Sequence, residues 1–531
     1  MPKINYKALQ NGSDIRGIAL PTVSDEPVNL TDVVIENIIT GFIYLLANKL
    51  SAPLGDLRVS VGRDSRTSGE HIAKIVCKTL QKLGVQALDT GLASTPAMFM
   101  STKIDNFNCH GAIMITASHL PQNRNGFKFF SASGGVGKDT INKILEIAEQ
   151  RDDNSSATAS LYENEMRHEQ GAYSIKPIEK IDIMSKYCEI LRKQISVALG
   201  SDEKPLSGMK ILVDAGNGVG GFYAENILKP LGANTSGSLY LEPDGTFPNH
   251  IPNPEKNEAV KDIINQVKAR GADLALVFDT DVDRVAAIDE KGKPMVRNGI
   301  IAVAASLIYK LHPASFVVTD SITSPELAEF LNDKLGLRHF RYRRGYKNVI
   351  DKAKTLIDEG KDCQLAIETS GHAAFKENFF LDDGAFLATK IVIEATRLKK
   401  EGMGISSLTS ELSEPAESME YRLPINAKGE KVKKIGEVIL STLEEWTKDE
   451  GSNYGAVLEE PNYEGVRIKF PNGWLLLRMS LHDPIMPLNI ESQVLGGTKR
   501  IISLIKPLLD TFAELDTDTL DTVTLDADTL G

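Results

Sequence analysis

The chain has few cysteines and no long uncharged apolar run, and each shortage excludes a class of protein. Its 531 residues contain four scattered cysteines and no C-x-x-C pair, so neither a zinc site nor a disulfide framework is indicated. Reduced, buried thiols are typical of a cytoplasmic protein. No uncharged run approaches the ~18 residues that span a membrane, and the N-terminus has no apolar signal core. We therefore expect a cytoplasmic protein with no membrane partner.

Positive charge is also in deficit. The chain has 60 basic and 72 acidic residues, a net charge of −12. A nucleic-acid partner is therefore not expected, and an anionic substrate would need a locally basic cleft. At roughly 150 residues per domain, the length indicates three or four domains. The sequence is compatible with a monomer or a dimer.

Apolar strand-like runs alternate with helical segments, which predicts an α/β fold. Three similar α/β domains are predicted, followed by an α+β domain. In the last one, 466–470 and 474–478 flank a Pro-Asn-Gly turn and predict a β-hairpin. The expected domains are 1–170, 171–300, 301–411 and 412–510.

The tail, 511–531, has an unusual repeat. Leu515, Leu520, Leu525 and Leu530 recur every five residues, and from Glu514 onward the chain has six acids and no base. Five-residue spacing matches neither the helix nor the strand period, so we predict an acidic, disordered tail.

The most informative stretch is Thr116–Lys128, which follows the apolar run Gly111–Ile115. Ser118 and His119 stand where that strand is expected to end, and a Pro, Asn and Gly cluster then forces a turn. An exposed serine on a constrained loop, with basic groups around it, can carry a phosphoryl group.

A second stretch places Asp279, Asp281 and Asp283 directly after the apolar run Leu274–Phe278, with Arg284 next. Three carboxylates at alternate positions suit a hard divalent cation. A phosphorylated Ser118 beside them would require one, because it adds nearly two negative charges. Together the two loops indicate phosphoryl transfer assisted by Mg²⁺.

Two other interpretations of the aspartate loop are open. Its carboxylates at positions 1, 3, 5 and 12 resemble an EF-hand, but Arg284 stands where glycine is required and a strand precedes. In a haloacid-dehalogenase-like phosphatase, Asp279 would be the nucleophile, but the fifth position would usually be Thr or Val and here is Asp283.

Three loops in three successive units resemble the motifs of the α-D-phosphohexomutase superfamily. Thr116–Lys128 resembles T-A-S-H-N-P-x-x-x-N-G-x-K, Asp279–Arg284 resembles D-G-D-x-D-R, and Ile367–His372 resembles G-E-x-S-G-H. In the first motif the residues in register are Thr116, Ala117, Ser118, His119, Pro121, Asn125, Gly126 and Lys128. The shorter stretches Ser13–Gly17, Gly62–Arg66 and Ser94–Pro96 also look familial. The resemblance covers roughly residues 11–495.

The resemblance implies a four-domain fold around a central cleft and a Mg²⁺-dependent mutase that binds a hexose phosphate. Ser118 would be the phosphorylated residue and a metal ligand, together with Asp279, Asp281 and Asp283, and Arg284 would stabilise charge. The acid/base and catalytic candidates are His119, Lys128, Arg16 and His372. The sugar-binding candidates are Lys347, Glu368, Ser370, Gly371 and His372.

The last domain departs from the family pattern R-x-S-G-T-E-P-x-x-R. Arg478, Ser480 and Pro484 match, but Leu481, His482, Asp483 and Pro487 replace its glycine, threonine, glutamate and second arginine. A missing arginine removes a bidentate phosphate contact, and leucine hinders the close backbone approach that glycine permits. Arg478, Ser480 and His482 remain the candidate phosphate ligands.

The leading hypothesis is a phosphohexomutase that interconverts glucose or mannose 1- and 6-phosphates through a 1,6-bisphosphate. The alternatives are a phosphoglucosamine mutase, a hexose-bisphosphate synthase and a catalytically weak sugar-phosphate-binding regulator. The altered last loop motivates the last two.

Overall fold

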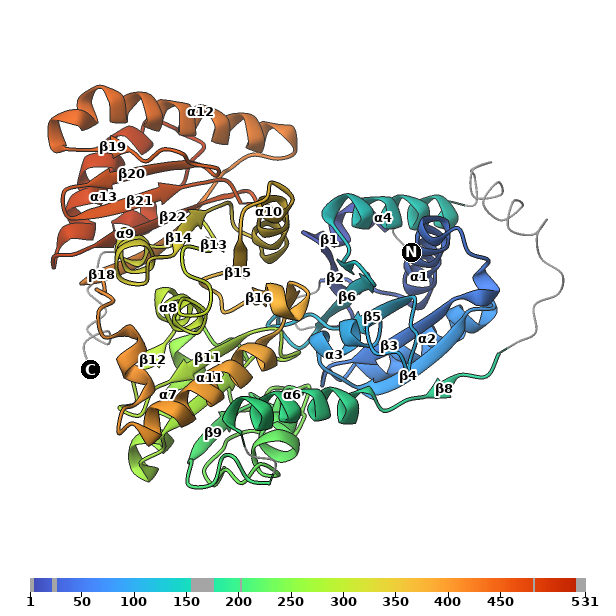
Figure 1. Cartoon of the computed structure of the whole chain (residues 1–531). Coiled ribbons are helices and arrows are strands. Elements are labelled where there is room, and N and C mark those ends of the chain that lie inside the picture. Colours follow the sequence, from blue (N-terminus) through green and yellow to red (C-terminus); the bar gives the residue numbers. More distant parts are fainter. Residues whose placement is uncertain (1–3, 22–25, 154–175, 201–202, 481–482, 522–531) are drawn as a thin grey trace.

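Four β-sheets follow one another along the chain and surround a central region (Figure 1). The computed structural model describes residues 4–21, 26–153, 176–200, 203–480 and 483–521. The first three sheets are mixed and covered by helices, and the fourth is antiparallel. The predicted α/β architecture with a C-terminal α+β unit is confirmed.

The first sheet has the order β1-β2-β6-β5-β3-β4-β8, with β7 paired to β6. At its centre β3 and β5 run parallel, so the loops that follow them meet at one edge. β8 lies beyond the predicted domain boundary at residue 170. Strands: β1 Gln10–Asn11, β2 Asp14–Ile18, β3 Arg58–Arg63, β4 Gln86–Leu92, β5 Gly111–Ile115, β6 Arg124–Ser131, β7 Gly134–Gly135, β8 Glu179–Lys180.

Helix α1 (Asp32–Leu50) is long and apolar enough to cross a membrane by length and composition alone. It is packed against α2 (Gly69–Lys82) and α4 (Lys138–Asp152), and its apolar side chains are part of the core of the first unit. This burial is the reason for its hydrophobicity. The short helix α3 (Thr95–Met100) lies on the other side of the sheet, in a different core.

The second and third units share one hydrophobic core. The second sheet has the order β12-β11-β10-β9 and the third the order β14-β13-β15-β16-β17. Helix α11 (Gly384–Lys400) follows the third sheet in sequence but packs on α6 (Ile183–Leu199) and on β10 and β11 of the second. The two units are therefore packed tightly against each other. Strands: β9 Ile211–Asp214, β10 Leu274–Phe278, β11 Val285–Ile288, β12 Pro294–Met295, β13 Phe316–Thr319, β14 Arg338–Arg341, β15 Cys363–Ile367, β16 Ala373–Phe375, β17 Leu381–Asp382.

The remaining helices of these units cover the sheet faces or join the strands. They are η3 (Tyr223–Leu228), α7 (Asn257–Arg270), α8 (Asn298–Ser306), α9 (Pro325–Glu329), η4 (Phe330–Lys334) and α10 (Tyr346–Asp358).

The fourth unit has the strand order β18-β22-β21-β20-β19, with α12 and α13 against the sheet. The predicted hairpin is confirmed as β20 and β21, in which Phe470 pairs with Gly473. Its elements are β18 Glu417–Pro424, α12 Glu430–Lys448, β19 Val457–Leu458, β20 Val466–Phe470, β21 Gly473–Leu477, β22 Ile485–Ser492 and α13 Gly497–Leu509.

The predicted disorder of the tail is wrong for residues 511–521. Leu515 and Leu520 are 6% and 2% exposed and belong to the core of the fourth unit. Glu514 O accepts from Asn426 N, and a short 3-10 turn, Asp518–Leu520, follows. An extended segment and a tight turn bring both leucines to the same core, so the leucines are buried without the apolar spacing of a helix or a strand. Leu525 and Leu530 lie outside the described residues.

Candidate active site

Ser118 begins a tight turn immediately beyond β5. Its φ is 48°, in the left-handed region that serine seldom adopts. Its backbone N–H donates to Thr116 Oγ1 at 2.8 Å, and its hydroxyl donates to Asp279 Oδ2 at 2.8 Å. The serine is only 6% exposed, because the second unit covers it; the expectation of an exposed serine is corrected.

Arg66 fixes the serine loop from the neighbouring loop after β3. This arginine is 1% exposed, and its Nε lies 3.3 Å from Asp64 Oδ2. The strained turn therefore has a rigid support that does not depend on ligand. Its guanidinium donates to the carbonyl oxygens of Ser118, Leu120, Pro121 and Arg124 at 2.5–3.0 Å.

The three aspartates after β10 lie together beside this serine. Asp279, Asp281 and Asp283 are at most 1% exposed, and each offers an oxygen within 4.8 Å of the others. Oδ1 of Asp281 and Oδ1 of Asp283 are buried without a hydrogen-bond partner among the described residues. Three converging carboxylates, two of them with a buried and unpartnered oxygen, fit a hard divalent cation.

The charges of this cluster are unevenly balanced. Burial, together with the neighbouring Asp283 and Asp281, raises the pKa of Asp279 well above its usual value. Asp283 behaves oppositely: burial would raise its pKa, but Lys128, His372 and Arg284 hold it below the usual range. A cation bound here would offset the repulsion among the three carboxylates.

Arg284 joins the serine to the aspartates. It is 1% exposed; its Nε donates to Asp279 Oδ2 at 3.1 Å, and an NH₂ group lies 3.3 Å from Ser118 Oγ. Its backbone also forms a bridge with His372 of the third unit. One arginine thus places positive charge at the serine hydroxyl and connects it to the third unit.

Lys128, on β6, is paired with two of the aspartates. Its ammonium contacts Asp283 and lies 3.5 Å from Asp281 Oδ2, and it stands over the Tyr346 ring. Burial alone would lower the pKa of Lys128, but the two carboxylates raise it well above its ordinary value. Lys128 therefore carries a proton at neutral pH.

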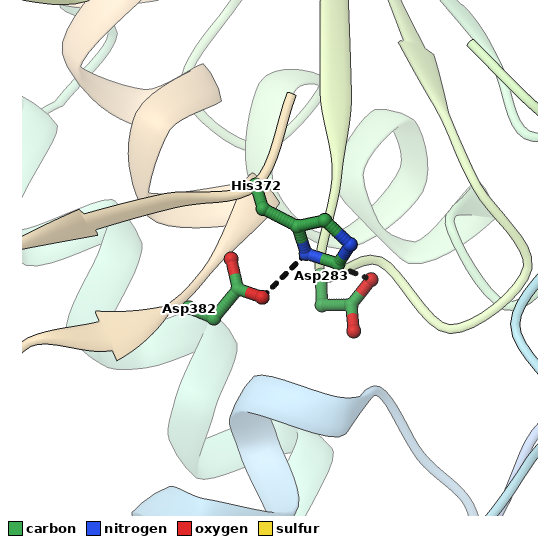
Figure 2. A group of neighbouring side chains, drawn as sticks. All are labelled: Asp283, His372 and Asp382. Carbon is green, nitrogen blue, oxygen red and sulfur yellow. Dashed lines mark hydrogen bonds and ion pairs between the residues drawn. The ribbon is translucent and has the colours of Figure 1, made fainter. Parts of the chain in front are cut away.

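Asp283 and Asp382 flank the imidazole of His372 (Figure 2). Nδ1 of His372 contacts Asp382 Oδ2 and lies 3.9 Å from Asp283 Oδ1. Burial would lower the pKa of His372, but the two carboxylates raise it to about 9. The ring is stacked on Tyr346 at 5.3 Å, so its plane and its charge are both set by neighbours.

His119 lies beside the serine hydroxyl, and Arg16 contacts the strand end before the serine. Nδ1 of His119 lies 3.3 Å from Ser118 Oγ, and the charge of Arg284, followed by burial, holds the pKa of His119 well below its usual value. His119 is therefore neutral and can accept a proton. Arg16 donates to Thr116 O and to Asp14 Oδ2, so it braces the strand end that leads into the serine loop.

The predicted sugar-binding loop faces the same region. Glu368 is 4% exposed and accepts from Gly345 N at 2.6 Å; burial, followed by Asp320, raises its pKa to about 7. The hydroxyl of Ser370 is buried without a hydrogen-bond partner among the described residues. Gly371 has φ 91°, and a Cβ there would lie 2.8 Å from Val285 O, so only glycine fits.

Lys347 lies at the start of α10, apart from this loop. Its amine pairs with Asp351 one turn along the same helix, and it borders a pocket with Lys128 and Asp382. Arg344 is instead the cation close to Glu368, whose negative charge contributes to raising the pKa of Arg344. Arg344 is therefore a further candidate beside Glu368, and the role of Lys347 stays a prediction.

The altered loop of the fourth unit is only partly described. Arg478 is 7% exposed, its NH1 lies 3.8 Å from Glu464 Oε1, and its Nε has no hydrogen-bond partner among the described residues. Ser480 Oγ accepts from Asp483 N at 3.2 Å. Leu481 and His482 lie outside the described residues.

Two residues of the site were not predicted from the sequence. Thr95 donates its hydroxyl to Asp281 Oδ2 at 2.5 Å and its backbone N–H to Asp281 O at 2.8 Å, so α3 of the first unit positions an aspartate of the second. The carboxylate of Asp382 contacts Nδ1 of His372 and so orients its ring. The Ser-Thr-Pro stretch and the paired acids Asp382-Asp383 were the available signals.

The geometry defines an enzyme of phosphoryl transfer: a buried serine, a three-carboxylate cation site and cations from three units. Comparison with known proteins agrees. Families described as phosphoglucomutase/phosphomannomutase, alpha/beta/alpha domains I, II and III match residues 7–155, 185–292 and 297–415. The chain belongs to the α-D-phosphohexomutase superfamily.

The similarity extends along most of the chain. A phosphomannomutase/phosphoglucomutase of Pseudomonas aeruginosa is 28% identical over 84% of this chain and 86% of its own length. A phosphoglucomutase of Neisseria gonorrhoeae is 27% identical over 94% and 95%. A Burkholderia thailandensis family structure covers 96% of this chain and 98% of its own, with 23% identity and a TM-score of 0.72, which supports the fold.

Proposed function

We propose that this enzyme interconverts the 1- and 6-phosphates of a hexose, glucose or mannose, through phosphorylated Ser118 and a hexose 1,6-bisphosphate. The observation that carries the proposal is the environment of Ser118 Oγ. It lies 2.8 Å from Asp279 and 3.3 Å from both Arg284 and His119. A hydroxyl between a neutral imidazole and a guanidinium is suited to gaining and losing a phosphoryl group.

In the first half-reaction the phosphoryl group leaves Ser118 Oγ as its phosphorus bonds to the free hydroxyl of the sugar phosphate. The hydroxyl proton passes to a base, and a proton returns to Ser118 Oγ from the enzyme. Lys128 and His372 carry protons at neutral pH, and His119 is free to accept one. The second half-reaction reverses these transfers with the other phosphate of the bisphosphate.

Asp279, Asp281 and Asp283, with a phosphate oxygen on Ser118, would hold the cation, which we propose is Mg²⁺. It would offset the negative charge on the phosphoryl group and polarise phosphorus. Lys128 and Arg284 hold the same aspartates in place from the first and second units. Ser118 therefore meets its charge partners without rearrangement of the loops.

Sugar hydroxyls would be recognised by Glu368 and Ser370. Glu368 is buried, and the Ser370 hydroxyl has no partner among the described residues, so both can bond to a ligand. Arg344 and Arg478 would receive the distal phosphate. The relatives include enzymes named for glucose and for mannose phosphates, and we propose both as substrates of a cytoplasmic monomer or dimer.

A coupled mutase assay with glucose 1-phosphate and mannose 1-phosphate, run with and without added hexose bisphosphate, tests this proposal. Formation of the 6-phosphate, with one phosphate on the intact protein, is the expected result. Bisphosphate accumulation without 6-phosphate would favour a synthase, and binding without turnover would favour a regulator.

A further inference from the structure

The pocket that Lys347 borders with Lys128 and Asp382 extends beyond these acid/base groups. It is a small hollow of about 40 Å³ that opens to solvent, between β6 and β7 of the first unit and α10 of the third. Its inner end reaches Lys128, Asp283 and Asp382. The proposed reaction assigns no task to its outer part.

Three lysines gather at this outer part. Lys347 and Lys354 line the pocket from α10. Lys103 stands over the rings of two lining residues, with its Nζ 5.0 Å from the centre of Phe379 and 5.6 Å from that of Phe99. Lys347 is paired with Asp351, whereas Lys354 has no hydrogen bond or ion pair with any described residue.

The lysines are close enough to repel one another. Burial lowers the pKa of Lys354, and the charges of Lys347 and Lys103 lower it further, although Asp351 opposes them. Of the carboxylates in and beside the pocket, Asp351 pairs with Lys347, whereas Asp283 and Asp382 lie at the inner end with Lys128 and His372. An anion between Lys354 and Lys103 would remove this repulsion.

The walls of the pocket leave room for such an anion. Gly134 has φ 119°, and a Cβ there would lie 3.5 Å from Lys354 Nζ, which places the ammonium beside β7. Phe379 and Phe380 both have positive φ, 60° and 51°, and Phe379 is 52% exposed. Two adjacent aromatic residues in strained conformations form the apolar wall opposite.

We propose that this pocket is a second anion site that takes a small phosphorylated molecule, with its phosphate between Lys354 and Lys103 and its body against Phe379 and Phe99. Lysine ammonium groups bind phosphate as point charges, and a mixed apolar and cationic lining is typical of small-molecule sites. The ligand would touch both the first and the third unit. It would therefore stabilise one relative placement of the units that carry Ser118 and His372.

Lysine labelling read by mass spectrometry tests the site independently of turnover. The probe is inorganic phosphate, with chloride at equal ionic strength as the reference. Lys352, also on α10, is the internal control, because it lies over Phe340 and outside the pocket. At nine times its Kd, phosphate should slow the labelling of Lys354 and Lys103 about tenfold and leave Lys352 unchanged.

Two variants sharpen the test. K354Q should abolish the phosphate protection of Lys103, whereas K352Q should retain it; K103Q should abolish that of Lys354. Glycerol 3-phosphate is the second probe. If it protects the lysines at a lower concentration than phosphate does, the apolar wall contributes to the affinity. If the two probes need equal concentrations, the affinity comes from the lysines. The proposal would be overturned if phosphate left the labelling rates of Lys354 and Lys103 unchanged. It would also be overturned if chloride slowed both rates as much as phosphate does.

Discussion

The serine site and the loop of the fourth unit differ in how firmly they are built. Ser118, Asp279 and Arg284 are 6%, 0% and 1% exposed, and hydrogen bonds from two units hold them. Arg478 is also buried, but it is held by an ion pair at 3.8 Å with Glu464. The reacting centre thus retains the family's serine, aspartates and arginine, whereas several residues of the loop that binds the distal phosphate are replaced. Chemistry and substrate affinity should therefore respond differently to mutation.

The largest effect is expected at the centre. Ser118→Ala removes the group that carries the phosphoryl group, so turnover should fall on the order of 10³-fold or more. Intact-mass measurement should show one phosphate on the wild type and none on the variant, with an unchanged fold. Ser410→Ala, at an exposed turn, is the control. Full activity of Ser118→Ala would end the phosphoserine mechanism.

Asp281→Asn should weaken cation binding, because one of three carboxylate ligands loses its charge. A lost charge-assisted contact of roughly 1.5–3 kcal/mol corresponds to about 10- to 150-fold more cation for half-saturation. Magnesium titration by calorimetry and by activity measures this, with the exposed Asp262→Asn as control. An unchanged titration would show that the cation binds elsewhere.

Asp382→Asn tests the positioning of His372. Asp382 raises the pKa of His372, so its removal should lower that pKa from about 9 and move the corresponding limb of the kcat/KM profile to lower pH. We expect up to about a 100-fold loss of kcat. A profile identical to that of the wild type, while Asp358→Asn also changes nothing, would exclude this role.

Arg478→Ala tests the weaker region. The altered loop offers fewer phosphate contacts than the family pattern. Removal of the Arg478 guanidinium should therefore raise KM about tenfold, which corresponds to roughly 1.5 kcal/mol, with a smaller change in kcat. Arg422→Ala on the exposed face of β18 is the control. An unaltered KM would mean that the fourth unit has left the active site and would favour the regulator.

The smallest effect on catalysis is expected from the tail. Leu515→Ala and Leu520→Ala should each lower the free energy of unfolding by roughly 2–3 kcal/mol, because both side chains are buried. Activity well below the melting temperature should change little. Urea denaturation measures the loss, and deletion of 522–531 is the comparison. Unchanged stability would mean that the two leucines do not pack in solution.

Much of the site was predictable because it is local in sequence. The motif around Ser118 and the alternating aspartates after β10 each follow a buried strand, so backbone geometry alone presents their side chains at a sheet edge. The role of Lys347 stays a prediction, because its basic neighbours Arg343 and Arg344 give the same signal in the sequence. The tail was misjudged because irregular segments bury side chains without a period.

The sequence by itself determined the α/β class, the order of the units and the residues of phosphoryl transfer, because strand patterning and reactive loops are encoded in short stretches. Only the tertiary structure decided which groups meet: Thr95 on Asp281, Asp382 on His372, Arg66 under the serine loop and Leu515 in the fourth core. These partners are distant in sequence or leave no periodic signal. Their proximity depends on how whole units pack, and no local propensity specifies that.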